Sequence, residues 1–294
     1  MTDWTSWQAH VEQTIADRGQ WVGLCDGHGR PLIDMPTAQS MTAGQARLAE
    51  ASLSMEMKVT GGKWAPVHPV VDLMIADGLG VFDEEGRLVV KNNIVDMVVV
   101  AKPGRRHAYV TSFPTAVGDA TSPNTLRVQG TDLIGNLVTW PCPSVPQTWI
   151  PNVTLFEGDA SGAYETPRLL SAMEMSLVAD GYTMSGPAEE TIRTLVQDSF
   201  DAVNYQCGWE DTPHMVVDMA PTGRESPLAH IRVTDGMVWE TIAPPAQLAG
   251  VNITIDLWWP GDDPVLTRLP DKSGTALTTW THPIGVVRIE QGGQ

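Results

Sequence analysis

Residues 47–59 read RLAEASLSMEMKV, and this stretch decides the fold of the first half of the chain. Within it, Leu53, Met55, Met57 and Val59 alternate with other residues. Successive side chains of a β-strand point to opposite faces, so a period of two predicts a strand with one buried face. A sheet with one buried face is therefore the expected framework around this stretch.

Further strands are predicted on both sides of this one. The segment 21–34 consists of two extended runs around Asp26-Gly27-His28-Gly29, which is typical of a hairpin. Shorter apolar runs predict strands at 70–75, 87–90, 94–100, 107–113 and 126–130, with a turn at 83–86 and a short helix at 133–138. Frequent short strands favour a small barrel or sandwich.

A helix is predicted before the first hairpin. Trp4, Trp7, Val11 and Ile15 recur on one helical face, Thr2 or Asp3 can cap the start, and Gly19 ends the pattern.

The second half of the chain follows a proline-rich connector. Its prolines are Pro141, Pro143, Pro146 and Pro151, and such a run stays extended and stiff. The elements predicted beyond it are a helix at 187–203, a strand at 215–219, a helix at 236–243 capped by Asp235 and kinked or split by Pro244-Pro245, and an alternating strand at 251–257 after Gly250. We expect three segments: a barrel-like domain with a leading helix at 1–140, the connector with an α+β insertion at 141–225, and an α+β segment of a second barrel-like domain at 226–294.

The charge balance argues against some partners. The chain of 294 residues has a net charge of −17, with 18 basic and 35 acidic residues. Binding to a phosphate backbone depends on Lys and Arg. The longest basic run is Arg105-Arg106, so we expect no nucleic-acid binding and no attraction to an anionic membrane surface. No apolar run of 18 residues predicts a membrane span, and the first residues do not resemble a secretory signal.

Signatures of catalysis and metal binding are not found in the sequence, so no catalytic, cofactor-binding or metal-binding residue is predicted. Gly61-Gly62-Lys63 and Gly78-Leu79-Gly80 do not complete a phosphate or dinucleotide motif. The seven histidines are spaced unlike metal ligands, and Cys25, Cys142 and Cys207 are expected to be small buried hydrophobes.

Four acidic or aromatic clusters have an alternative interpretation. Asp83/Glu84/Glu85 and Asp262/Asp263 could hold a cation, but solvated turns are expected instead. Glu189/Glu190 could be an acid–base pair, but neighbouring residues on a helix do not face one site. Trp258-Trp259 could stack on a sugar ring, whereas core or interface packing is the favoured interpretation.

Three segments resemble a known family. They are the strand and short helix of Leu126 to Leu137 (LRVQGTDLIGNL), the helix around Ala188 to Ile192, and Met237 to Ala243 followed by Leu248-Ala249-Gly250-Val251 and the alternating strand. This order resembles the minor tail proteins of siphophages that infect actinobacteria, and it is similar to the Gp37-like family of tail-tip hub proteins.

The resemblance implies an α+β, β-rich fold of small barrel-like domains with helical insertions, and a homotrimer around the tail axis. It implies a structural virion protein without enzymatic activity, assembled in the host cytoplasm. Its expected neighbours are the distal tail protein, the tape measure protein and other minor tail proteins, and it would border the DNA ejection channel. The alternative is a glycan-binding module at the tail tip.

Overall fold

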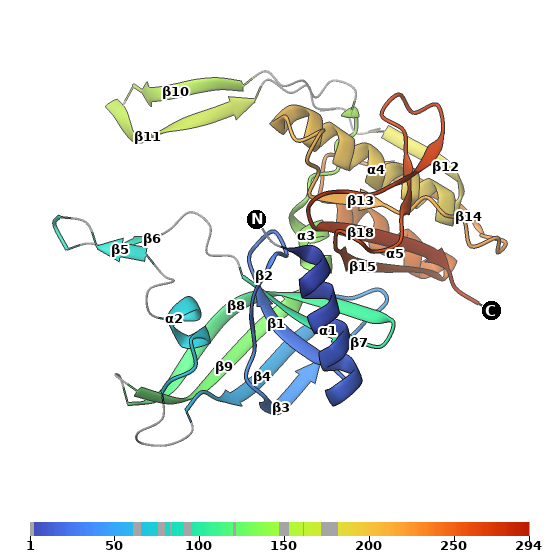
Figure 1. Ribbon diagram of the computed structural model, residues 1–294. Coiled ribbons are helices and arrows are strands. Elements are labelled where there is room, and N and C mark those ends of the chain that lie inside the picture. The colour runs from blue at the N-terminus through green and yellow to red at the C-terminus, as the bar shows by residue number, and fades with distance from the viewer. Residues whose placement is uncertain are drawn as a thin grey trace. The chain divides into compact units, whose positions relative to one another are not determined.

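The computed structural model describes residues 3–60, 66–75, 80–82, 84–86, 88–90, 96–119, 122–146, 153–160, 162–171 and 182–293. Residues 61–63, Gly78, Leu79, Asp83 and the connector from 147 to 151 lie outside this part of the chain. The α+β class is confirmed: the chain is rich in strands, forms several sheets and includes helices in both halves (Figure 1).

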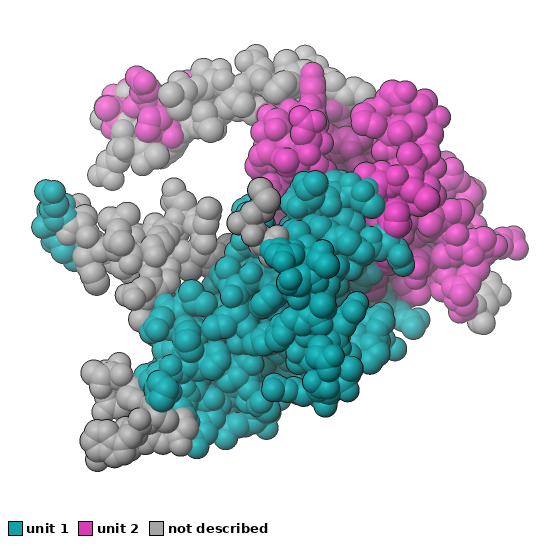
Figure 2. Space-filling view, viewed as in Figure 1, with its two compact units in different colours: residues 1–135, 255–263, 279–285 teal, residues 136–254, 264–278, 286–294 magenta. Residues whose placement is uncertain are grey.

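Two compact units divide the chain (Figure 2). Unit 1 consists of 1–135, 255–263 and 279–285, and unit 2 consists of 136–254, 264–278 and 286–294. Residues 226–294 thus contribute to both units. The division into three consecutive segments at 140 and 225 stays a prediction.

Unit 1 is built on a seven-stranded antiparallel sheet. The strand order is β2-β1-β7-β8-β9-β4-β3. The strands are β1 (Trp21–Cys25), β2 (Pro31–Asp34), β3 (Ala38–Ala43), β4 (Ser52–Lys58), β7 (Met97–Lys102), β8 (Arg105–Asp119) and β9 (Ser122–Asp132). The predicted hairpin at 21–34 is confirmed, and Asp26 stabilises its turn by accepting hydrogen bonds from the backbone N–H groups of His28 and Arg30.

This sheet is strongly curled although it is open. Its two edge strands, β2 and β3, are joined by only residues 35–37, a link that spans at most about 14 Å when fully extended. The edges of a flat seven-stranded sheet would lie about 29 Å apart. The sheet therefore bends toward closure, as the expected barrel-like domain requires, but the described strands do not close a barrel.

The concave face of the sheet encloses the core of unit 1. Leu53, Met55 and Met57 of β4 are at most 2% exposed, which confirms the alternation on which the strand prediction rested. They form one cluster with residues from β1, β7, β8 and β9, from the segment Val70–Met74 and from the positions directly after β2 and β4: Leu24, Met35, Val59, Val70, Val71, Met74, Val98, Val100, Tyr109, Leu126 and Val128.

The strand predicted at 70–75 is wrong, because Val70–Met74 forms a helix, α2. Pro69 precedes it, and the backbone N–H of Val70 donates to Nδ1 of His68. Val70, Val71 and Met74 are buried in the core cluster of unit 1. Helical spacing brings these three side chains to one side, so packing overrides the strand preference of β-branched residues.

Unit 2 is organised around the helix α4 (Ala188–Cys207). The helix predicted at 187–203 is confirmed; it begins after Pro187 and ends at Gly208, whose φ is 69°. It packs against α5 (Val238–Ala249) and β12 (Tyr182–Pro187), and α5 packs against β14 (Leu228–Val233).

The strands of unit 2 form several small sheets. β12 pairs with β14, β10 (Val153–Asp159) with β11 (Gly162–Ser171), and β16 (Val265–Arg268) with β17 (Thr275–Thr278). A three-stranded sheet has the order β13 (Met215–Val217), β18 (Ile284–Gln291) and β15 (Val251–Trp258). The remaining described elements are α1 (Trp4–Arg18), α3 (Ile134–Thr139), β5 (Gly80–Phe82) and β6 (Leu88–Val90).

The second predicted helix differs from α5 in two respects. Asp235 does not cap it, because the Asp235 carboxylate accepts a hydrogen bond from the backbone N–H of Ser144, and the helix begins after Met237. The helix also continues through Pro244-Pro245 to Ala249. Val238, Ile242 and Ala246 are fully buried on one face, so packing compensates for the hydrogen bonds that the prolines cannot donate.

A test of this packing compares two leucines of unit 2. Leu195 of α4 is 2% exposed, so the substitution Leu195→Ala should lower the free energy of unfolding by about 2–5 kcal/mol, measured by urea denaturation. Leu248 of α5 is 90% exposed, so Leu248→Ala should change it by less than about 0.5 kcal/mol. Equal effects of the two substitutions would contradict the placement of α4 in the core.

Candidate functional site

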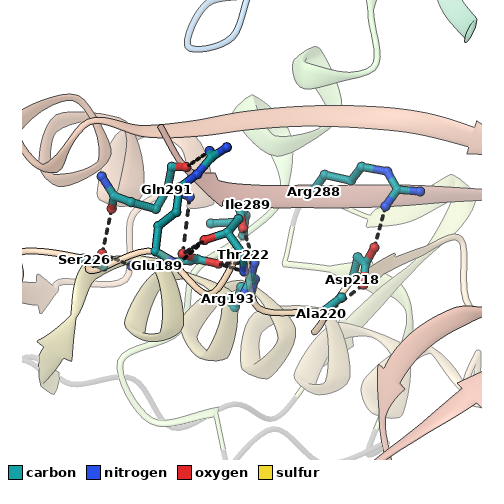
Figure 3. A network of polar contacts seen from close by, with 10 residues as sticks. Glu189, Arg193, Asp218, Ala220, Thr222, Ser226, Arg288, Ile289 and Gln291 are labelled. Atoms are coloured by element: carbon teal, nitrogen blue, oxygen red, sulfur yellow. Dashed lines mark hydrogen bonds and ion pairs between the residues drawn. The ribbon is translucent and has the colours of Figure 1, made fainter. Parts of the chain in front are cut away.

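A buried ion pair joins two residues of α4 in the interior of unit 2. Arg193 lies one helical turn after Glu189, with Nη2 of Arg193 2.5 Å from Oε1 of Glu189 (Figure 3). Their side chains are 5% and 7% exposed, respectively. Removing two such charges from water is costly, so each needs further hydrogen bonds.

The remaining hydrogen bonds of this pair come from other segments of unit 2. Glu189 accepts from the backbone N–H and the hydroxyl of Thr222 and from the backbone N–H of Gln291, while Arg193 donates to the carbonyl of Ile289. Gln291 in turn accepts from the Ser226 hydroxyl and donates to the carbonyl of Ala249. The network therefore ties α4 to β18 and to the segment before β14.

The pKa of Glu189 follows from these contacts. Burial raises it, but the hydrogen bonds from Thr222, the charge of Arg193 and the hydrogen bond from Gln291 outweigh burial, so the pKa lies below its usual value. Glu190 is exposed, whereas Glu189 is 5% exposed. The two neighbouring carboxylates therefore lie in different surroundings, and Glu189 is a structural anchor.

The second charged cluster lies in unit 1 and contains two of the candidate residues. Asp262 accepts from Nη1 of Arg106 at 2.5 Å and from the backbone N–H of Trp259 at 2.7 Å. The guanidinium of Arg106 lies 3.9 Å from the centre of the Trp259 ring. The prediction of a solvated turn at Asp262/Asp263 is wrong for Asp262, whose carboxylate is held by this cation.

The tryptophan pair is buried. Trp258 and Trp259 are 5% and 0% exposed, and their indole N–H groups donate to the carbonyls of Asp263 and Gly29. The prediction of core packing is confirmed, and neither ring presents a face to a sugar. Gly29 has a φ of 81°, and a Cβ there would lie 2.8 Å from a methyl group of Leu257, so this turn requires glycine.

The structure also brings together groups that the sequence analysis missed. Burial and the nearby charge of Asp26 raise the pKa of Asp96 to about 6. Ser185 Oγ lies 2.7 Å from Nδ1 of His230, directly opposite on the paired strands β12 and β14, and both residues are exposed. The members of each pair are far apart along the chain, so no local motif signals the pair.

The other candidates remain scattered. Cys25 and Cys142 are buried as predicted, and burial raises the pKa of both thiols, whereas Cys207 is exposed, contrary to the prediction. Within the described ranges, no group of three or more His, Cys, Asp or Glu side chains could hold a metal ion. Among the same residues, no helix is long and apolar enough to span a membrane.

The comparisons with known proteins find similarity among solved structures. No protein family matches the sequence, and no curated protein matches it. Among solved structures, the chain is similar to the 43 kDa tail protein of prophage MuSo2 from Shewanella oneidensis, with a TM-score of 0.30 and 12% sequence identity. The similarity covers 91% of this chain and 52% of that protein, so the chain spans about half the length of its neighbour. At this TM-score and identity it establishes neither a shared fold nor a shared function.

The buried ion pair makes a prediction for pH-dependent stability. Glu189→Gln leaves the charge of Arg193 buried without its partner, so unfolding free energy near neutral pH should fall by about 3–5 kcal/mol. Because the folded pKa of Glu189 is lowered, its stabilisation is present above the unfolded value of about 4.3 and is lost as the pH falls through the folded value. The difference between wild type and variant, measured by urea denaturation between about pH 7 and pH 3, should therefore shrink toward low pH.

The matched control is the exposed neighbour. Glu190→Gln should change the unfolding free energy by less than about 0.5 kcal/mol across the same range. A difference for Glu189→Gln that grows toward low pH would contradict the assignment of Glu189 as the stabilising carboxylate.

Proposed function

We propose that this chain is a structural protein of a siphophage virion, a minor tail protein of the tail-tip hub that borders the DNA ejection channel. Its proposed neighbours are further copies of itself, the distal tail protein, the tape measure protein and other minor tail proteins. The protein would join the tail tube to the host-attachment apparatus, after assembly in the host cytoplasm, and would catalyse no reaction.

The proposal is carried by the three segments that resemble tail-tip hub proteins. The first forms the end of β9 and α3, the second is the start of α4, and the third is α5, which ends at Gly250 and leads into β15. These elements support the proposal because they are the strand, helices and alternating strand that the resemblance implies at those positions.

The distribution of basic side chains is compatible with a channel wall that does not hold DNA. In unit 2, Arg193, Arg268, Lys272 and Arg288 are bound to carboxylates, and Arg224 donates to a backbone carbonyl. In unit 1, Arg106 is bound to Asp262, so the Arg105-Arg106 run has one cation fewer to offer to a phosphate. The net charge of −17 then repels DNA.

The glycan-binding alternative required exposed rings at Trp258 and Trp259. Trp258 and Trp259 are both buried, and a buried indole cannot stack on a sugar ring. The structural role in the virion is therefore the one that we retain.

DNA binding is the first test. Purified protein should not bind duplex DNA at about 0.15 M salt, and lowering the salt should not produce binding, since attraction to phosphate requires unpaired cations. Fluorescence anisotropy of labelled DNA measures binding at each salt concentration. A variant with Glu190→Lys and Glu240→Lys, two exposed positions, should gain affinity at low salt and controls for the sensitivity of the assay. Micromolar binding by the wild type that weakens with added salt would contradict a passive channel wall.

Location and copy number are the second test. Antibodies against the chain should label the tail tip of virions that contain it, and a map of that tip should show three copies around the axis. Light scattering of the assembled tip should give the same subunit number. Labelling elsewhere on the particle, or one or two copies at the tip, would contradict the proposal.

A further inference from the structure

The N-terminal helix α1 is attached to unit 1 by few contacts. Of its fifteen residues only Val11 is buried, and no backbone hydrogen bond joins the helix to another element of the described chain. It packs against β1 and β7. Its contacts are made by side chains: Trp4 against Trp259, Trp7 against Trp21, His10 with Asp34, and Gln8 with Asp262.

The surface that receives α1 is held in place without the helix. Trp21 donates its indole N–H to Asp34 and Trp259 donates to the Gly29 carbonyl, while the two rings meet edge to face at 5.8 Å. Arg106 stacks on Trp259 and is bound to Asp262. Both indole N–H groups are thus satisfied by residues outside α1.

The docking of α1 leaves one polar group unsatisfied. Nε1 of Trp7 is buried and has no hydrogen-bond partner. A buried donor without an acceptor weakens the docked state. On the receiving surface, Trp21 and Trp259 retain their hydrogen bonds, and Nε of Arg106 is also buried without a partner.

The link between α1 and β1 is short. It consists of Gly19 and Gln20, and Gly19 has a φ of 78°. A Cβ at Gly19 would meet no atom within 4 Å, so nothing packs against this glycine. The fifteen residues of α1 are about 22 Å long, so a helix that turned about this point would place Trp4 about 22 Å from the link.

We propose that α1 is an exchangeable arm, and that in assemblies of this protein the α1 of one copy docks on the Trp21–Trp259 surface of a second copy. The inference rests on the self-association in the proposed function. Exchange preserves every contact of the helix, so its cost is confined to the link, as in domain swapping.

The second copy is the occupant that the receiving surface fits best. The surface places Asp34 opposite His10, Asp262 opposite Gln8 and two indoles opposite Trp4 and Trp7, and the α1 of any other copy supplies this same set. These contacts are aromatic and locally paired, so they tolerate association between copies that each have a net charge of −17.

Cross-linking between two differently tagged chains tests the exchange. One chain has His10→Cys and the other Asp34→Cys, both with Cys207→Ser because Cys207 is exposed. The side chains of His10 and Asp34 meet at 2.7 Å and are both about half exposed, so a short bismaleimide can bridge these positions. After the chains are mixed at high concentration, exchange predicts a covalent product that contains one chain of each tag, at least five-fold above the control.

The control replaces His10→Cys by Ala9→Cys, at an exposed neighbouring position. A second variant, Trp4→Ala with Trp7→Ala, should lower the self-association that light scattering measures, and it does not depend on the Asp34 substitution. A further chain carries both His10→Cys and Asp34→Cys. The exchange would be overturned if this chain were linked only within itself and the mixed chains gave no more cross-chain product than the control. If light scattering then still showed several copies, the proposed self-association would stand; wild-type chains that remain single at high concentration would overturn both.

Discussion

The buried pair of Glu189 and Arg193 constrains the whole of unit 2. Opposite charges that are less than one-tenth exposed are stable only if nearly every lone pair and N–H group finds a partner. Thr222, Ile289 and Gln291 supply most of those partners from segments that are 29 or more residues away along the chain, while Nε of Arg193 is buried without one. The position of β18 beside α4 is thus required by the helix. A helix that is buried on most sides and still carries charge specifies its surroundings more strictly than an apolar helix would.

In unit 1, an aromatic ring takes part in stabilising a charged side chain that is removed from water. Arg106 binds Asp262 and lies against the face of Trp259, although its Nε is buried without a partner, and Trp259 is in turn fixed by Gly29 and by the edge of Trp21. A residue near the end of the chain is thereby part of the first unit. The tryptophans that might have served as a binding platform are used to hold a cation and a turn in place, which explains why the chain is rich in Trp without exposing this pair.

Both arrangements affect the surface of the protein. Most cations for which contacts are described in unit 2 are bound to carboxylates or carbonyls, and the whole chain has a net charge of −17. A surface of this kind suits a protein that contacts other proteins through apolar and aromatic groups while DNA passes without adhering. Both proposals, the place in a phage tail and the exchangeable α1, depend on cations that are paired within the protein and on acidic side chains at its surface.

Local patterns in the sequence determined many elements. The alternation in β4, the period of α1 with its Asp3 cap and Gly19 end, the start of α4 after Pro187 and the alternation in β15 were all correctly predicted, because caps, turns and one-sided burial act within a few residues. Only the tertiary structure decided that 70–74 is helical, that α5 continues through two prolines, and that Asp262 binds Arg106. In each of these cases the deciding contact comes from another part of the chain, and a contact between distant segments leaves no periodic signal in the sequence.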